Sequence, residues 1–210
     1  SADIRTRKKE MRREIRKRIG ELSFDQRAQE AERSAEMLFE LPEWNNAATV
    51  LIFVAMKGEI GTRRIIDRAL EEGKRIGLPR MHGDSMDFHM VAGPGDGIDT
   101  SKRLYGDLSL HTYGILEPPE ERQIFDAREE QLPAVVITPG LGFDRRGGRR
   151  GHGKGFYDEW FGRHEELLSE GSMRAVAVGY SVQLVEEVPA GQSDMRVPLI
   201  VIDGELIRAE

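Results

Sequence analysis

The sequence contains no cysteine, and it lacks any apolar run long enough to cross a membrane. Without cysteine, disulfides, thiolate metal ligands and cysteine nucleophiles are excluded, although nothing follows about the cellular compartment. No apolar signal-peptide core follows the N-terminus, so we expect a cytoplasmic protein without a membrane partner. Positive charge is not in excess either: 31 Lys and Arg stand against 37 Asp and Glu, for a net charge of −6. This balance argues against a general nucleic-acid or anionic-membrane binder.

The apolar residues gather in runs that predict an α/β fold. Continuous, β-branched apolar runs at residues 48–55 and 132–138 are typical of strands buried on both faces of a sheet. Other periodic segments predict strands at 75–79, 87–91, 174–180 and 197–202, and helices at 3–19, 23–39, 62–74 and 155–168. Because strands alternate with helices, we expect an open, mostly parallel, Rossmann-like sheet flanked by helices. We expect one domain over residues 1–210, beginning with a basic helix.

A glycine-rich basic stretch between residues 138 and 161 is the most informative part of the chain. Five glycines from Gly147 to Gly155 are interleaved with arginines, His152 and Lys154, after a buried strand and before an amphipathic segment. Glycine lets the backbone approach a ligand closely, and a helix start offers unpaired N–H groups to phosphate. The stretch therefore predicts an anion site, in which Lys154 and Arg149 could hold a polyphosphate. The alternative is a flexible basic surface loop.

The same stretch partly matches a P-loop. The spacing from Gly148 to Gly153 and Lys154 satisfies most of that motif, but Gly155 stands where a hydroxyl would hold magnesium. The glycines also begin well beyond the end of the preceding strand. Both departures argue against a P-loop NTPase.

Three polar segments follow predicted strands, at residues 57–59, 140–158 and 181–194. Parallel sheets bind ligands beyond the carboxyl ends of their strands, so these segments could converge on one site. Asp158 lies just past the glycines, where a bound phosphate would bring magnesium, which takes one or two carboxylates. Asp194 and Glu59 are further carboxylates at this edge. Taken alone, Asp158 could be an acid at a helix N-terminus and Asp194 an ordinary turn residue.

Lys8 and Arg12 are one turn apart on the basic N-terminal helix, so they share a face. They could clamp a phosphate or a nucleobase edge, or belong to a solvated charged face. Glu59 could accept hydrogen bonds from the amino groups of a heterocycle.

Several short motifs follow one another along nearly the whole chain. They are Lys8 with Arg12, Glu59 to Thr62, Leu78 to Arg80, Gly114 to Pro118, Pro139 to Asp144, and Gly147 to Asp158. In these residues the chain resembles the 5-formyltetrahydrofolate cyclo-ligases, also called methenyltetrahydrofolate synthetases. The glycine motif is specific, whereas each of the others is weak alone.

The resemblance implies a cyclo-ligase-type α/β fold and an enzyme that uses ATP and Mg²⁺. The reaction implied is conversion of 5-formyltetrahydrofolate to 5,10-methenyltetrahydrofolate through phosphorylation of the formyl oxygen, with release of ADP and phosphate. Its partners would be two small molecules, a reduced folate and ATP, without nucleic acid.

The resemblance also implies roles for individual residues. Those implied for ATP binding are Lys8, Arg12, Arg149, Arg150, Gly151, His152, Gly153, Lys154, Gly155, Phe156 and Tyr157. Those implied for the folate are Val54, Glu59, His152, Gly153, Lys154, Gly155 and Phe156. Asp158 and Asp194 are the implied magnesium ligands, and Lys154 and Arg149 the expected catalytic cations.

The chain departs from the family pattern at four places. His152 and Glu159 stand where arginine is common, Met56 lies where a serine is frequent, and Pro198 replaces a frequent aspartate. A diverged relative that acts on another formylated substrate, or a non-catalytic folate- or nucleotide-binding module, therefore stays open.

Two alternatives come from other classes. A different enzyme on this scaffold would need a positioned base or carboxylate nucleophile, and none stands out in the glycine-rich stretch. RNA binding through the basic N-terminal helix is disfavoured by the net charge.

Overall fold

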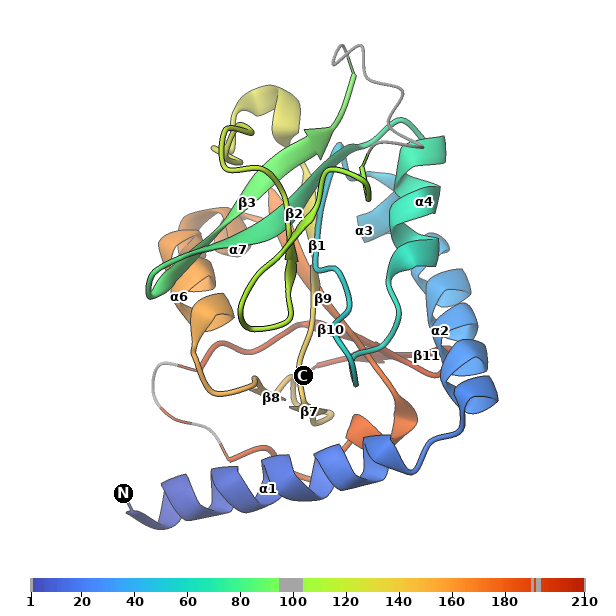
Figure 1. The fold of residues 1–210 in the computed structure, drawn as a ribbon, viewed down its shortest axis with the longest axis vertical. Helices are drawn as coiled ribbons and strands as arrows, with labels where there is room; N and C mark the ends of the chain where they lie inside the picture. Colours follow the sequence, from blue (N-terminus) through green and yellow to red (C-terminus); the bar gives the residue numbers. More distant parts are fainter. Residues whose placement is uncertain (1, 95–103, 190, 192–193, 210) are drawn as a thin grey trace.

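The structure is a computed structural model, and it describes residues 2–94, 104–189, 191 and 194–209. Its centre is a seven-stranded sheet in the order β11-β10-β9-β6-β1-β2-β3 (Figure 1). The strands are β1 (Thr49–Ile52), β2 (Arg75–His82), β3 (Ser85–Ala92), β6 (Ala134–Thr138), β9 (Met173–Gly179), β10 (Leu199–Ile202) and β11 (Glu205–Arg208). The five inner strands are parallel, and β3 and β11 are antiparallel at the two edges. The predicted open, mostly parallel sheet is therefore confirmed.

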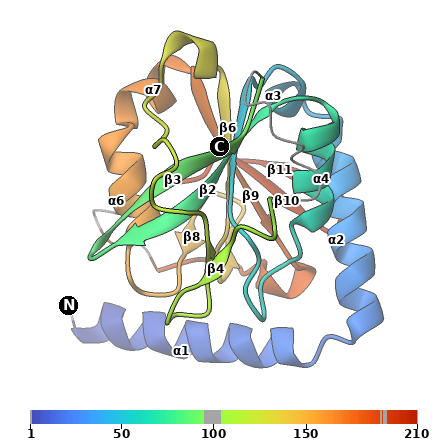
Figure 2. The same ribbon diagram turned by 45° about the horizontal axis from the view of Figure 1, so that its top comes forward.

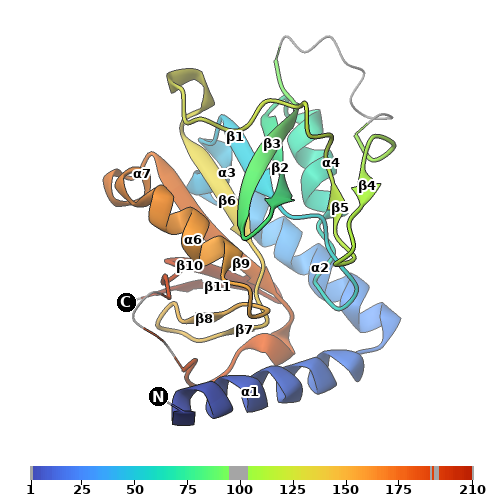
Figure 3. The same ribbon diagram turned by 60° about the vertical axis from the view of Figure 1, so that its left-hand side comes forward.

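Helices cover both faces of this sheet. On one side lie α2 (Phe24–Phe39), α3 (Pro42–Asn45) and α4 (Arg63–Glu71), and on the other α6 (Phe156–Arg163) and α7 (Glu165–Glu170) (Figures 1 and 3). Each side has its own buried apolar cluster, the first including Leu38, Trp44 and Ile66, the second Phe88 and Trp160. Of the helices that the structure describes, none combines the length and apolar character needed to span a bilayer.

The long helix α1 (Ala2–Gly20) runs across one end of the sheet rather than along a face (Figure 2). Only two of its residues, Ile15 and Ile19, are buried, which explains why the rest of the helix can be so basic. It packs on the 3₁₀ helix η2 (Ser181–Gln183), directly after β9, and on β7 (Gly142–Phe143), shortly after β6. The helix therefore lies at the carboxyl ends of the parallel strands, where such sheets bind ligands.

The structure differs from the sequence-based expectations in several short elements. The glycine-rich stretch is not a simple loop, because β7 pairs with β8 (Arg149–Arg150) in an antiparallel hairpin. The expected helix over 155–168 is broken at His164 into α6 and α7. Other elements were not predicted: α3, β11, the 3₁₀ helices η1 (Glu129–Gln131) and η2, and a separate hairpin of β4 (Ser109–Leu110) with β5 (Leu116–Glu117).

Candidate active site

A pocket of about 650 Å³ opens at the carboxyl ends of β1 and β6, beneath α1. Segments that follow β1, β6 and β9 all reach it, so the predicted convergence is confirmed for Glu59, residues 149–158 and Asp194, whereas the other described residues of these segments lie outside the wall. The predicted site residues in its wall are Lys8, Val54, Glu59, Arg149, Arg150, Gly151, His152, Gly153, Lys154, Gly155, Phe156, Tyr157, Asp158 and Asp194. Arg12 is the predicted residue outside this wall.

Arg12 lines a second recess, of about 740 Å³, between α1 and His152. His152 belongs to both hollows, so they adjoin. The Arg12 guanidinium lies over Gly153, where a side-chain Cβ would come within 2.9 Å of its Nη1. Gly153 has φ +114°, a backbone conformation that favours glycine, and any side chain there would also displace the Arg12 guanidinium. Arg12 is therefore in contact with the glycine-rich stretch although it stands outside the main pocket.

The arginines of β8 are enclosed rather than solvated. Arg149 is 7% exposed, and its Nε donates a hydrogen bond to the Pro139 carbonyl at 2.6 Å. Its guanidinium carbon lies 5.1 Å from the centre of the Tyr157 ring, and Nη1 is 3.9 Å from Asp158 Oδ1. Burial lowers the pKa of Arg149, although Asp158 opposes this effect. The alternative of a flexible basic surface loop is therefore wrong for this arginine.

Among the residues that the structure describes, no carboxylate lies within ion-pair distance of Arg12, Arg150 or Lys154. The Nε of Arg150 is buried without a hydrogen-bond acceptor among the described residues. Lys154 is exposed at the mouth, where its Nζ lies 5.4 Å from the centre of the Tyr113 ring. The pKa of Arg12 is lowered by partial burial and then by the neighbouring charges of Arg150 and Arg16. The arrangement concentrates positive charge that an anion could neutralise.

The two predicted metal carboxylates lie in adjoining segments of the wall. Asp158 Oδ1 accepts a hydrogen bond from the Met195 amide at 3.1 Å. Asp194 Oδ2 accepts from Lys8 Nζ at 2.9 Å and from the Gly191 amide at 2.7 Å. Partial burial acts to raise the pKa of Asp194, but the Gly191 hydrogen bond and the Lys8 ion pair outweigh it, so the pKa is lowered. Asp194 is thus a carboxylate anion at neutral pH.

The carboxylates of Asp158 and Asp194 fit a magnesium ion that takes further ligands from phosphate and water. They do not fit a metal ion whose ligands all come from the protein. Within the described residues, no group of three or more His, Asp or Glu side chains could hold a metal ion. Magnesium commonly binds through one or two carboxylates and takes its other ligands from phosphate and water. Asp158 and Asp194, which lie beside the cations, are two carboxylates of the kind that magnesium uses.

The pocket wall also contains an enclosed acid, Glu59. The Glu59 side chain is 7% exposed, and its Oε1 accepts from the Met56 amide at 2.8 Å. Its Oε2 lies 3.5 Å from His152 Nε2. The Tyr157 hydroxyl is buried without a partner among the described residues, and burial followed by the charge of Glu59 raises its pKa. Tyr157 therefore stays protonated and keeps a hydrogen bond to donate.

Part of the wall was not assigned from the sequence. Apolar side chains from β2 and from the β4–β5 hairpin complete it, namely Pro79, Met81, Tyr113 and Ile115. Pro79 and Ile115 lie within the short motifs described above, yet those motifs gave them no role. Phe53, Met56, Pro139 and Glu159 also line the pocket.

Comparison with known proteins gives matches over nearly the whole chain. The sequence profile of the 5-formyltetrahydrofolate cyclo-ligase family matches residues 4–203. A Schizosaccharomyces pombe protein named probable 5-formyltetrahydrofolate cyclo-ligase is 30% identical over 182 residues, covering 82% of this chain and 83% of that protein. A Caenorhabditis elegans protein of the same name is 27% identical over 201 residues, which cover 95% of this chain and 94% of that protein. The NMR structure of Aquifex aeolicus 5,10-methenyltetrahydrofolate synthetase aligns with a TM-score of 0.71 at 27% identity. The alignment covers 96% of this chain and 92% of the Aquifex aeolicus protein.

Proposed function

The chain belongs to the 5-formyltetrahydrofolate cyclo-ligase family, and from this premise we propose that it converts 5-formyltetrahydrofolate to 5,10-methenyltetrahydrofolate with cleavage of ATP to ADP and phosphate. Its relatives carry the names of enzymes, and the chain is an enzyme of this class. The observation that carries the proposal is the composition of the pocket. Apolar side chains and the enclosed acid Glu59 line the same pocket as a set of cations and two carboxylates. Such a lining suits a flat heterocycle beside a metal-bound polyphosphate.

The triphosphate of ATP would lie against the hairpin, the start of α6 and α1. Arg12, Arg150 and Lys154 have no carboxylate partner within the described residues, so phosphate oxygens would supply their counter-charge. Phosphoryl transfer needs mainly alignment and charge neutralisation, and a set of cations without a nucleophile provides both. Lys154 and Arg149 are the proposed catalytic cations.

Asp158 and Asp194 would hold the magnesium ion. When bound, magnesium neutralises charge on the phosphate oxygens and orients them. Lys8 forms an ion pair with Asp194, so it lies close enough to this position to contact a phosphate as well.

The folate would occupy the pocket between Val54, Glu59 and the residues from His152 to Phe156. Glu59 Oε2 could accept hydrogen bonds from N–H groups of the pterin, because only its Oε1 is used by the Met56 amide. The apolar wall formed by Met81, Tyr113 and Ile115 would exclude water from the reacting groups.

Two bond exchanges complete the proposed reaction. The formyl oxygen attacks the terminal phosphorus, which forms an oxygen–phosphorus bond and releases ADP. N10 of the folate then attacks the activated formyl carbon and loses its proton, and the carbon–oxygen bond breaks to release phosphate. The residues align the reactants and stabilise negative charge, and no protein side chain forms a covalent bond.

The test is near-ultraviolet absorbance of the purified protein with 5-formyltetrahydrofolate, ATP and magnesium, because the methenyl product absorbs strongly there. A rise in absorbance that requires both ATP and magnesium is expected. A flat trace beside an active control enzyme would refute the proposal. A flat trace would instead favour a diverged relative that accepts a different substrate because of its departures from the family pattern at Met56, His152, Glu159 and Pro198.

A further inference from the structure

The turn between β7 and β8 is built around the buried carboxylate of Asp144. This side chain accepts three backbone hydrogen bonds and is 5% exposed. Two come from its own turn: Arg146 N and Gly148 N donate to Oδ1 at 3.0 and 2.8 Å. The third comes from a distant part of the chain, because Val188 N donates to Oδ2 at 2.8 Å. Asp144 therefore joins the hairpin to the segment that leads to Asp194.

A second bond joins the same two regions beyond Asp194. Val197 N donates to the Gly147 carbonyl at 2.9 Å. A side chain on Gly147 would place its Cβ 2.6 Å from the Val197 carbonyl oxygen, so the two backbones are in close contact. The turn thus holds the chain on both sides of Asp194, at Val188 and at Val197.

The hairpin also determines where Asp158 lies. From the turn, β8 leads through the glycines into α6, whose third residue is Asp158. The Met195 amide, next to Asp194, donates to the Asp158 carboxylate at 3.1 Å. The separation of the two carboxylates therefore depends on how the Asp194 segment is anchored to the turn.

We infer that Asp144 is a positioning residue for the metal carboxylates, through its bond to the Val188 amide. The inference rests on the proposed function, because it assigns magnesium to Asp158 and Asp194. Groups that orient metal ligands commonly change metal affinity about 10–100-fold when they are altered. Asp144 touches neither substrate nor metal in this arrangement, and it acts through the backbone.

Asp144→Asn separates this role from a general role in folding. The asparagine oxygen can still accept from Arg146 N and Gly148 N, because an amide orients its oxygen toward the two donors. Its NH₂ group would then face the Val188 N–H, and two donors cannot bond. The variant is expected to keep the turn and lose the anchor. Asp126→Asn is the matched control, since Asp126 accepts from Arg128 Nε and its side chain is 48% exposed.

Two readouts test the inference. At saturating ATP and folate, the magnesium concentration for half-maximal rate should rise about tenfold or more in Asp144→Asn and stay unchanged in Asp126→Asn. In metal-free wild type, the Val188 amide should exchange with deuterium more slowly than the Glu187 amide, and this protection should be lost in Asp144→Asn. The folded fraction by circular dichroism should equal that of wild type.

The possible outcomes distinguish a failure of the inference about Asp144 from a failure of the proposed function. If wild type shows no magnesium-dependent turnover, the proposed function fails while amide exchange still reports the anchor. If turnover is present and Asp144→Asn has the wild-type magnesium requirement, the inference is overturned. Val188 exchanging as fast as Glu187 in wild type overturns it too, even if the variant does not fold.

Discussion

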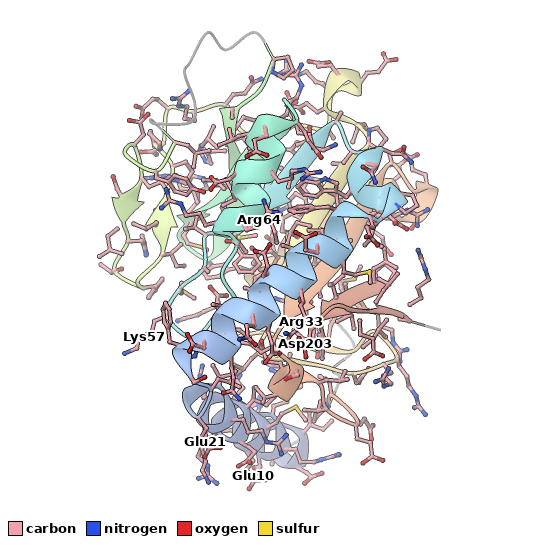
Figure 4. All side chains as sticks on the ribbon, turned by 90° about the vertical axis from the view of Figure 1, so that its right-hand side faces the viewer. Glu10, Glu21, Arg33, Lys57, Arg64 and Asp203 are labelled. Carbon is pink, nitrogen blue, oxygen red and sulfur yellow. The ribbon has the colours of Figure 1, made fainter. Side chains whose placement is uncertain are left out.

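On the outer face of α2 and α4, arginines and carboxylates form ion pairs, whereas around the pocket cations lie beside one another. Arg64 pairs with Glu32 and Glu36, at 3.3 and 3.1 Å. Arg33 of α2 pairs with Asp203 from the β10–β11 turn at 2.5 Å (Figure 4). In contrast, Arg12 faces Arg150 and Arg16, and the structure places no carboxylate of its described residues within ion-pair distance of Arg12.

The difference shows where charge has a function in this molecule. Exposed ion pairs contribute little to stability, since solvent screens them and the side chains lose freedom. Cations gathered without partners oppose folding through mutual repulsion. Arg12, which lies beside Arg150 and Arg16, therefore carries charge that an external anion would balance, while the charges of Arg64, Glu32 and Glu36 already balance one another.

The largest expected effect comes from removing a pocket cation that a phosphate would contact. Lys154→Ala should lower kcat/KM about 10³-fold, because a cation aimed at developing phosphate charge stabilises the transition state more than the ground state. The absorbance assay at saturating folate measures the loss. Thermal unfolding should change little, since Lys154 is exposed and forms no hydrogen bond or ion pair with the residues that the structure describes.

Lys57→Ala is the control for this substitution. Lys57 is also exposed, in the turn after β1, and lies outside the pocket wall. The kcat/KM of the Lys57→Ala variant should stay within about twofold of wild type, because solvent and salt screen the charge of Lys57 from the site. Equal activity in Lys154→Ala and wild type would remove the glycine-rich stretch from the catalytic machinery.

A smaller effect is expected at Arg12, at the border between the two recesses. Arg12→Ala should raise KM for ATP about tenfold, since one hydrogen bond to a charged group contributes about 1.5–3 kcal/mol. The melting temperature without ligand should not fall, because the substitution removes the repulsion from Arg150 and Arg16. Tripolyphosphate should raise the melting temperature of wild type more than that of the variant.

Arg5→Ala provides the matched change on the same helix. Arg5 is exposed and lines neither recess. Its KM for ATP and its response to tripolyphosphate should equal those of wild type. A loss of binding in both variants would mean that the charge of the whole helix attracts the nucleotide, without a specific contact at Arg12.

The larger elements of the fold were predictable because each leaves a periodic pattern in the sequence. The apolar runs at 48–55, 132–138, 174–180 and 197–202 correspond to β1, β6, β9 and β10. The predicted helix at 23–39 corresponds to α2, and Pro42, which follows it, is the first residue of α3, a position that proline favours. The break after α6 coincides with a local contact, in which the His164 ring stacks on Trp160 four residues earlier, with 3.9 Å between the ring centres, and His164 Nδ1 lies 2.7 Å from the Trp160 carbonyl oxygen.

The site was predictable to the extent that strand order determines it. Segments after parallel strands meet at one edge, so Glu59, Asp158 and Asp194 were expected together. The burial of Arg149 was not predictable, since Arg145 and Arg149 look alike in sequence and only the β7–β8 pairing encloses one of them. Tyr113 was missed because the β4–β5 hairpin reaches the pocket through tertiary packing.

The smallest expected effect is on the balanced face, at Arg64. Arg64→Ala breaks both ion pairs of an arginine whose side chain is 42% exposed, so it should leave kcat/KM within about twofold of wild type. The melting temperature should fall by no more than about 2 °C, and 0.5 M sodium chloride should reduce the difference because salt screens exposed pairs. Tripolyphosphate should stabilise this variant as much as wild type. If Arg64→Ala instead impaired turnover or anion binding as Arg12→Ala does, the face of α2 and α4 would also take part in binding, and the contrast between Arg64 and Arg12 would not hold.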